Sequence, residues 1–265
     1  MSENTHPAPE QGVMEALQLA GRIIIENGGE TYRAEETICR MGQGIGLTEV
    51  ESFAVPSGLF ISYRGHDGLL ESSVKRVHRQ GTNLTKIDQV NAVSRKVTAG
   101  QMSIQEAWEE LQRIDASRGP VASGWMILAA FLCAGGFALL FGGGEWEILF
   151  AGLVAAVVQL VGLVNQKMHM QWLVTAIFGG FLTSLLPHFI IHLLPGVSQE
   201  ILIAGAVMPL VPGLAMTNAV QDTMRGDMVS GLSHGTQALL TACLIAGGAL
   251  LSNALVRLLE GGLLG

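Results

Sequence analysis

Four polar side chains in the apolar second half of this chain are of the types that bind a small solute or carry a proton. Asn218 and Asp222 are spaced to lie one turn apart on the same face of a helix. Asp227 and His234 follow closely, and a histidine changes its charge near neutral pH. Ionisable residues inside hydrophobic segments mark functional sites in membrane proteins. We therefore predict a substrate-binding or gating site here, with His234 as a candidate proton carrier.

An interrupted apolar segment precedes these residues. Met208-Pro209-Leu210-Val211-Pro212-Gly213 lies within a hydrophobic run that begins near Ile201. Each proline removes a backbone N–H, and hydrocarbon offers no water to the groups that are freed. Broken helices of this kind surround the binding sites of transporters. We expect a second half-helix to begin near Leu214 and to offer its free N–H groups to a solute carboxylate. Pro209, Pro212 and Gly213 therefore join the predicted site.

Some of the polar residues have a second interpretation. Asp227 and Arg225 are equally consistent with a position at the cytoplasmic mouth of the pathway. His188 and His192 share a face near the end of another apolar run, and a metal pair is one interpretation of this spacing. Interface-level side chains or a proton-sensitive gate are the interpretations that we favour. We predict no metal site.

The composition indicates two different parts. The 265 residues have a mean hydropathy of +0.42, and only 14% are charged, against about 25% in typical soluble domains. Most charged residues lie in 1–120, whereas Lys167, Arg225 and Arg257 are the only basic residues after that point. This asymmetry predicts a soluble domain joined to a membrane domain. The net charge of −7 argues against nucleic-acid binding, which requires a basic surface.

We predict a disordered tail at residues 1–11 and a cytoplasmic α+β domain at 12–120. Apolar spacing predicts helices at about 12–26 and 31–44, with Thr31 as the N-cap of the second. Two short strands are expected on either side of Pro56-Ser57-Gly58, and a third from Leu69 to Val77. Helices at about 84–99, with Leu84 on its apolar face, and at 103–114 complete this domain. Ser57, Asp67 and His78 could serve an enzyme, but no nucleophile elbow accompanies them, and solvated turns are the favoured interpretation.

Residues 121–265 are predicted to form an all-α membrane domain of five transmembrane helices, since about 20 apolar residues cross a bilayer. The expected spans are about 122–141, 146–164, 171–194, 200–220 and 230–257. Lys167 and Arg225 lie in the second and fourth links, so the positive-inside rule puts these links on the cytoplasmic side and the C-terminus outside. Glycines such as Gly180 and Gly248 predict close helix packing.

Several motifs resemble those of the threonine/serine exporter family, in order along about residues 12–258. They are Asn27-Gly28-Gly29-Glu30-Thr31 with Glu35, Val55-Pro56-Ser57-Gly58, Arg76-Val77-His78-Arg79, Pro209-Leu210-Val211-Pro212-Gly213, Asn218-Ala219, Asp222 and Gly226-Asp227. The resemblance implies a cytoplasmic domain with ten membrane helices, divided in many bacteria between a large five-helix subunit and a small all-membrane subunit. This chain resembles the large subunit. The resemblance implies export of threonine, serine or a dicarboxylate such as succinate.

The residues and the resemblance together predict one subunit of a secondary exporter in the bacterial cytoplasmic (inner) membrane. We expect the proton-motive force to drive it, because no nucleotide-binding loop is present. The expected partners are the lipid bilayer, the small subunit and further copies of the chain, without catalytic residues, cofactor or nucleic acid. Two other hypotheses stay open, which are a membrane-anchored enzyme with a hydrolase-like soluble domain and a scaffold for another transporter.

Overall fold

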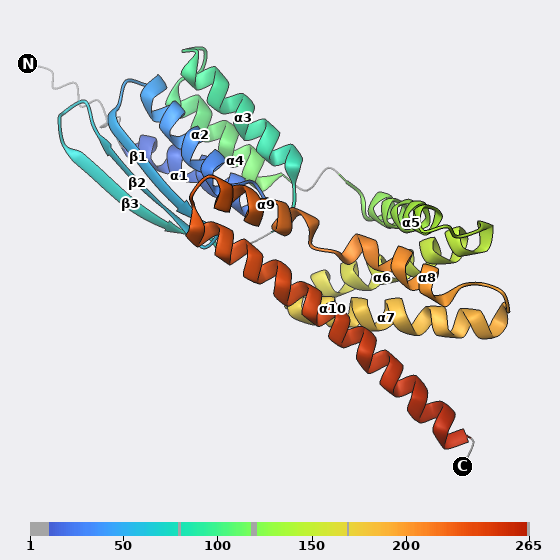
Figure 1. Ribbon diagram of the computed structural model, residues 1–265. Coiled ribbons are helices and arrows are strands. Elements are labelled where there is room, and N and C mark those ends of the chain that lie inside the picture. The colour runs from blue at the N-terminus through green and yellow to red at the C-terminus, as the bar shows by residue number, and fades with distance from the viewer. Residues whose placement is uncertain (1–10, 79–80, 118–120, 169, 264–265) are drawn as a thin grey trace, which may run out of the picture. The chain divides into compact units, whose positions relative to one another are not determined.

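The chain folds into two compact units, which are described separately. The computed structural model describes residues 11–78, 81–117, 121–168 and 170–263 (Figure 1). The first unit contains residues 1–120 and 214–235, and the second contains 121–213 and 236–265. Except for Gln11, where the first helix begins, the predicted tail at 1–11 lies outside the described residues.

Four helices of the first unit share one apolar core. They are α1 (Gln11–Glu26), α2 (Thr31–Gly44), α3 (Leu84–Thr98) and α4 (Ile104–Ala116). Leu17, Ile24 and Ile38 are fully buried in this core, as their helical spacing predicts. The predicted helices are therefore confirmed, although Leu84 is exposed rather than buried because it lies at the first turn of α3.

A three-stranded antiparallel sheet completes the core of the first unit, and the three predicted strands are confirmed. Strands β1 (Thr48–Val55), β2 (Gly58–Arg64) and β3 (Leu70–Arg76) are hydrogen-bonded in sequence order. Ala54 pairs with Leu59 on the buried face, whereas Phe53 pairs with Phe60 on the exposed face. Figure 1 shows α1 to α4 on one side of this sheet, so the face that carries Ala54 is the one that packs on the helices.

The second unit is built from apolar helices. They are α5 (Ser123–Leu140), α6 (Glu145–Lys167), α7 (Trp172–Leu193), α8 (Gln199–Val207), the short 3-10 helix η1 (Met208–Leu210) and the later part of α10 (Met228–Leu263). Among the described residues, four helices are long and apolar enough to cross a membrane, or five if one broken pair forms a single span.

The broken pair is the segment that was predicted as one span at 200–220. Its apolar run is divided into α8 with η1, then Val211-Pro212, then α9 (Gly213–Met224). The two prolines explain the interruption, since neither can donate a backbone hydrogen bond. Residues 214–235 belong to the first unit. The expected interruption at Pro209–Gly213, followed by a second half-helix, is confirmed, with α9 beginning at Gly213.

Two glycines allow α7 and α10 to approach closely in the second unit. A Cβ atom at Gly180 would overlap the carbonyl oxygen of Ile245, and one at Gly248 would overlap that of Ile177. Small residues at such crossings permit backbone contact between membrane helices. The predicted close packing at these two glycines is confirmed.

Candidate functional site

The candidate site lies in the first unit, at a helical hairpin made from α9 and the first turns of α10. Gly226 takes a positive φ of 89° after the last turn of α9, a conformation that glycine adopts without strain. The Asp227 carboxylate then accepts a hydrogen bond from the Ser230 N–H at 3.0 Å, which caps α10. The sequence Arg225-Gly226-Asp227 therefore stops one helix and starts the next.

Asp222 is the most enclosed charged group of this hairpin. Its side chain has no exposed surface, and it is held by two contacts from different elements. The Thr31 hydroxyl on α2 donates to Oδ1 at 3.2 Å. His234 Nδ1 on α10 lies 2.9 Å from Oδ2. Both carboxylate oxygens are thus satisfied, as a buried carboxylate requires.

Thr31 does not cap α2 as predicted. Glu30 occupies the N-cap position, and Thr31 is the first helical residue. Its hydroxyl lies 3.2 Å from Asp222 and 3.3 Å from Asp227. A hydroxyl has one hydrogen and can donate to only one carboxylate at a time. Thr31 therefore links α2 to either aspartate, which explains why its side chain is not used for capping.

Glu35 is a third carboxylate in this region. It lies one turn after Thr31 on α2, and its Oε1 accepts the Ala54 N–H at 2.7 Å. Burial raises the pKa of the Glu35 carboxyl, the Ala54 N–H opposes this, and the negative charges of Asp227 and Asp222 raise it further. The Ala54 carbonyl accepts the Ser230 hydroxyl at 3.4 Å, so β1 contacts both α2 and α10. We call Thr31, Glu35, Asp222, Asp227 and His234 the carboxylate–histidine cluster.

Neighbouring residues attach the hairpin to the same unit. The Asn218 side chain is buried and donates to the Gly28 carbonyl at 3.3 Å. The Arg225 guanidinium lies 3.4 Å from the centre of the Tyr32 ring, a cation–π contact. Asn218 therefore contacts the loop between α1 and α2, and Arg225 contacts α2 itself.

The residues predicted from the sequence fall into two sets. Asp222, Asp227 and His234 come together in the carboxylate–histidine cluster, with Asn218 one turn away on α9. Pro209 lies in η1, and Pro212 and Gly213 lie at the break, all within the second unit. Thr31 and Glu35 were missed as site residues. Their place in the motif Asn27–Thr31 with Glu35 could have indicated them. Periodicity could not, because contacts between segments far apart in the sequence leave no local pattern.

The residues of the enzyme hypothesis serve local structure where their contacts are described. The Asp67 carboxylate accepts the Leu69 N–H at 2.9 Å in the turn between β2 and β3. The Ser57 carbonyl accepts the Val77 N–H at 3.0 Å, which closes the sheet. His78 lines a polar surface groove with Arg22, Glu26 and Asp115. The Asp67 side chain and the Ser57 backbone therefore stabilise the turns of the sheet, and His78 lies in a surface groove.

The carboxylate–histidine cluster can hold a proton. Three acidic side chains lie close together with one histidine, and like charges at short distance favour the protonated form of one member. Glu35 is the member whose pKa is raised, first by burial and then by the charges of Asp227 and Asp222. The contacts of the cluster connect α2, β1 and the hairpin.

Comparison with known proteins finds relatives along most of the chain. The family model for threonine/serine exporters (ThrE) matches residues 15–256. The probable succinate transporter subunit YjjP of Klebsiella aerogenes is 26% identical over 220 residues, covering 80% of this chain and 81% of that protein. YjjP of Escherichia coli K12 is 24% identical, with 81% and 83% covered. The probable threonine/serine exporter of Mycobacterium tuberculosis is 20% identical over 85% of this chain but only 43% of its own length. No solved structure matches.

Proposed function

Because this chain belongs to the threonine/serine exporter family, we propose that it is one subunit of a secondary exporter of small carboxylate-bearing solutes. Family membership and the apolar helices make it a multi-pass membrane protein of a transporter family. Threonine, serine and a dicarboxylate such as succinate are the proposed solutes, following the names of its relatives. No catalytic step belongs to this proposal.

The observation that carries the proposal is the contact of buried Asp222 with His234 and Thr31. A proton shared by Asp222 and His234 offsets the repulsion among Asp222, Asp227 and Glu35. Loss of that proton favours separation of the hairpin from α2 and β1. In the proposed mechanism, the proton-motive force acts on the equilibrium between the attached and the separated hairpin. It thereby controls the position of α9, the helix that follows the proline break.

The proposed solute contact is at the beginning of α9. The N–H groups in the first turn of a helix attract a carboxylate. That of Gly213 donates to the Val211 carbonyl at 2.8 Å, so the N–H groups that follow it are the proposed contacts. Pro212 and Gly213 would position these groups, and Pro209 would keep the preceding turn from extending into them. Asn218, Asp222 and Asp227 are the proposed gating residues, further along α9 and in the turn after it.

The proposed location is the cytoplasmic membrane of a bacterium, with residues 12–120 in the cytoplasm and the C-terminus outside. The support is the concentration of charge in residues 1–120 and the position of Lys167 and Arg225 in alternate links. A small all-membrane subunit is the proposed partner. The two similar succinate transporter proteins are named as subunits, and this chain matches less than half of the longer exporter.

Replacement of Asp222 tests the proposal. Cells without their own exporters of this family would carry the chain with its small subunit and be loaded with threonine or succinate. We expect Asp222→Asn to lower export about tenfold or more, since a hydrogen bond to a charged group contributes about 1.5–3 kcal/mol. The control is Asp88→Asn, at an exposed position on α3. Normal export by Asp222→Asn at a normal level in the membrane would remove the carboxylate from the mechanism.

A further inference from the structure

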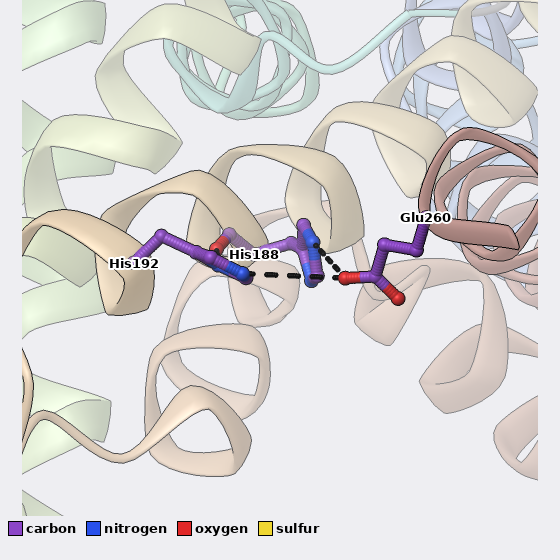
Figure 2. A group of neighbouring side chains, drawn as sticks. All are labelled: His188, His192 and Glu260. Carbon is purple, nitrogen blue, oxygen red and sulfur yellow. Dashed lines mark hydrogen bonds and ion pairs between the residues drawn. The ribbon is translucent and has the colours of Figure 1, made fainter. Parts of the chain in front are cut away.

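A second polar cluster lies in the second unit, far along the sequence from the carboxylate–histidine cluster. His188 and His192 come from the last turns of α7, and Glu260 comes from the last turns of α10. Figure 2 shows both imidazole rings directed toward the Glu260 carboxylate. None of these residues takes part in the function proposed above, so their juxtaposition needs its own explanation.

The distances between the three side chains suit a small ion. His188 Nε2 lies 3.3 Å from Glu260 Oε1, and His192 Nε2 lies 4.0 Å from the same oxygen. One ligand atom from each residue falls within 4.8 Å of the others. Ligand atoms around a tetrahedral zinc ion, with bonds of about 2.0–2.1 Å, are separated by about 3.3 Å. His188 Nε2 and Glu260 Oε1 already have this spacing, and a small rotation of the His192 side chain would bring its Nε2 to the same distance.

A hydrogen bond of His192 leaves one of its ring nitrogens able to bind a metal. His192 Nδ1 lies 2.9 Å from the His188 backbone carbonyl oxygen, which can only accept. Nδ1 therefore carries the hydrogen when the ring is neutral, and Nε2 keeps a free lone pair on the side of Glu260. Such a carbonyl partner on the second ring nitrogen is usual for metal-binding histidines.

The site is also accessible. The His192 and Glu260 side chains are 60% and 52% exposed, while His188 is 18% exposed beneath them. The two outer ligands are therefore open at the surface of this unit, and His188 is more enclosed. An exposed entrance and a partly buried inner ligand are compatible with reversible binding.

We infer that His188, His192 and Glu260 bind one divalent transition-metal ion of the zinc type. Two imidazoles and one carboxylate match the ligands of zinc sites with three protein ligands and one open position. Magnesium and calcium prefer oxygen ligands, so the two imidazoles select against them. The ion fastens the end of α10 to the end of α7, two helices that also cross at Gly180 and Gly248.

Titration of the metal-free full chain in detergent with Co²⁺ tests the inference, because tetrahedral Co²⁺ with nitrogen ligands absorbs visible light. We expect one equivalent to give this absorption and Zn²⁺ to displace it. His188→Ala, His192→Ala and Glu260→Gln should each weaken binding by about 100-fold or more, since even indirect partners of a metal contribute 10–100-fold. His66→Ala, at an exposed turn residue of the first unit, is the matched control.

A second measurement follows the helix contact itself. Zn²⁺ should raise the thermal unfolding midpoint of the wild-type chain, since an ion that binds only the folded protein stabilises it. The triple variant His188→Ala, His192→Ala, Glu260→Gln should show no such rise. Absence of Co²⁺ absorption in the wild-type chain would reduce the cluster to an ion pair and overturn the inference. Equal Co²⁺ binding by the triple variant would overturn it as well.

Discussion

Acidic side chains that lie close together repel one another, so other contacts must stabilise the group. Asp222 and Asp227 share one hydroxyl donor, Thr31, and Glu35 is close enough for both to influence its pKa. One histidine contacts this group of three carboxylates within the described residues. Replacing Glu35 with glutamine would remove one negative charge while keeping an oxygen for the Ala54 N–H. The electrostatic cost of the cluster can therefore be measured one residue at a time.

Glu35 gives a prediction about pH. Burial raises the pKa of its carboxyl above the ordinary 4.5. A group of this kind stabilises the folded state fully below its unfolded pKa, and this contribution is lost as pH rises through the folded pKa. We expect the unfolding midpoint of the full chain in detergent to fall over that range. Glu35→Gln should make the fall smaller, because glutamine does not ionise.

The exposed Glu15 on α1 provides the control for this experiment. Glu15→Gln removes the same charge from the same unit without touching the cluster, so it should leave the pH dependence of the unfolding midpoint unchanged. Identical pH profiles for Glu35→Gln and the wild-type chain would mean that the Glu35 charge contributes nothing to the stability of this unit.

At the scale of helices, neighbouring glycines on α10 make a matched pair. A Cβ at Gly248 would overlap the backbone of α7, whereas a Cβ at Gly247 would meet nothing within 4 Å. We expect Gly248→Ala to destabilise the chain by about 1–3 kcal/mol through overpacking. Gly247→Ala should be neutral or stabilising, since alanine favours a helix by about 1 kcal/mol over glycine. Thermal unfolding in detergent would compare them, and equal midpoints would contradict the α7–α10 crossing.

The elements show what a single sequence can predict. Apolar periodicity was sufficient for α1 to α4, the three strands and the long apolar helices, because each depends on residues near in sequence. Apolar periodicity also predicts one interrupted span at 200–220, which in the structure contains α8, η1 and α9. Both halves are apolar, and the second half belongs to the first unit through tertiary contacts such as those of Asn218 with Gly28 and Asp222 with Thr31.

The candidate site was predictable in part for the same reason. Asp222, Asp227 and His234 stand out as ionisable groups in an apolar context. Thr31 and Glu35 do not, since both lie on an ordinary amphipathic helix and meet Asp222 only through the tertiary fold. Glu260 was likewise not predicted to lie beside His188 and His192, because it is far from them in the sequence.

At the scale of the whole molecule, the second unit has more apolar surface than its own helices cover. Large apolar side chains are exposed on its spans, among them Leu132, Leu139, Leu140, Leu153 and Leu160. Large exposed apolar side chains in this number are typical of helices that contact lipid or another protein. Gly136 on α5 has nothing within 4 Å of its Cβ position, and a small residue of this kind would allow close approach of a further helix.

This surface leads to a prediction about assembly. The chain matches only 43% of the longer exporter from M. tuberculosis, and its two relatives of similar length are named as subunits, so we expect export to require the proposed second subunit. Cells without exporters of this family would carry the chain alone, the small subunit alone or both, with intracellular threonine and succinate followed over time. Only the pair should restore export. Full export by the chain alone would contradict the proposed small subunit. The size of the purified complex would then show whether several copies of this chain work together.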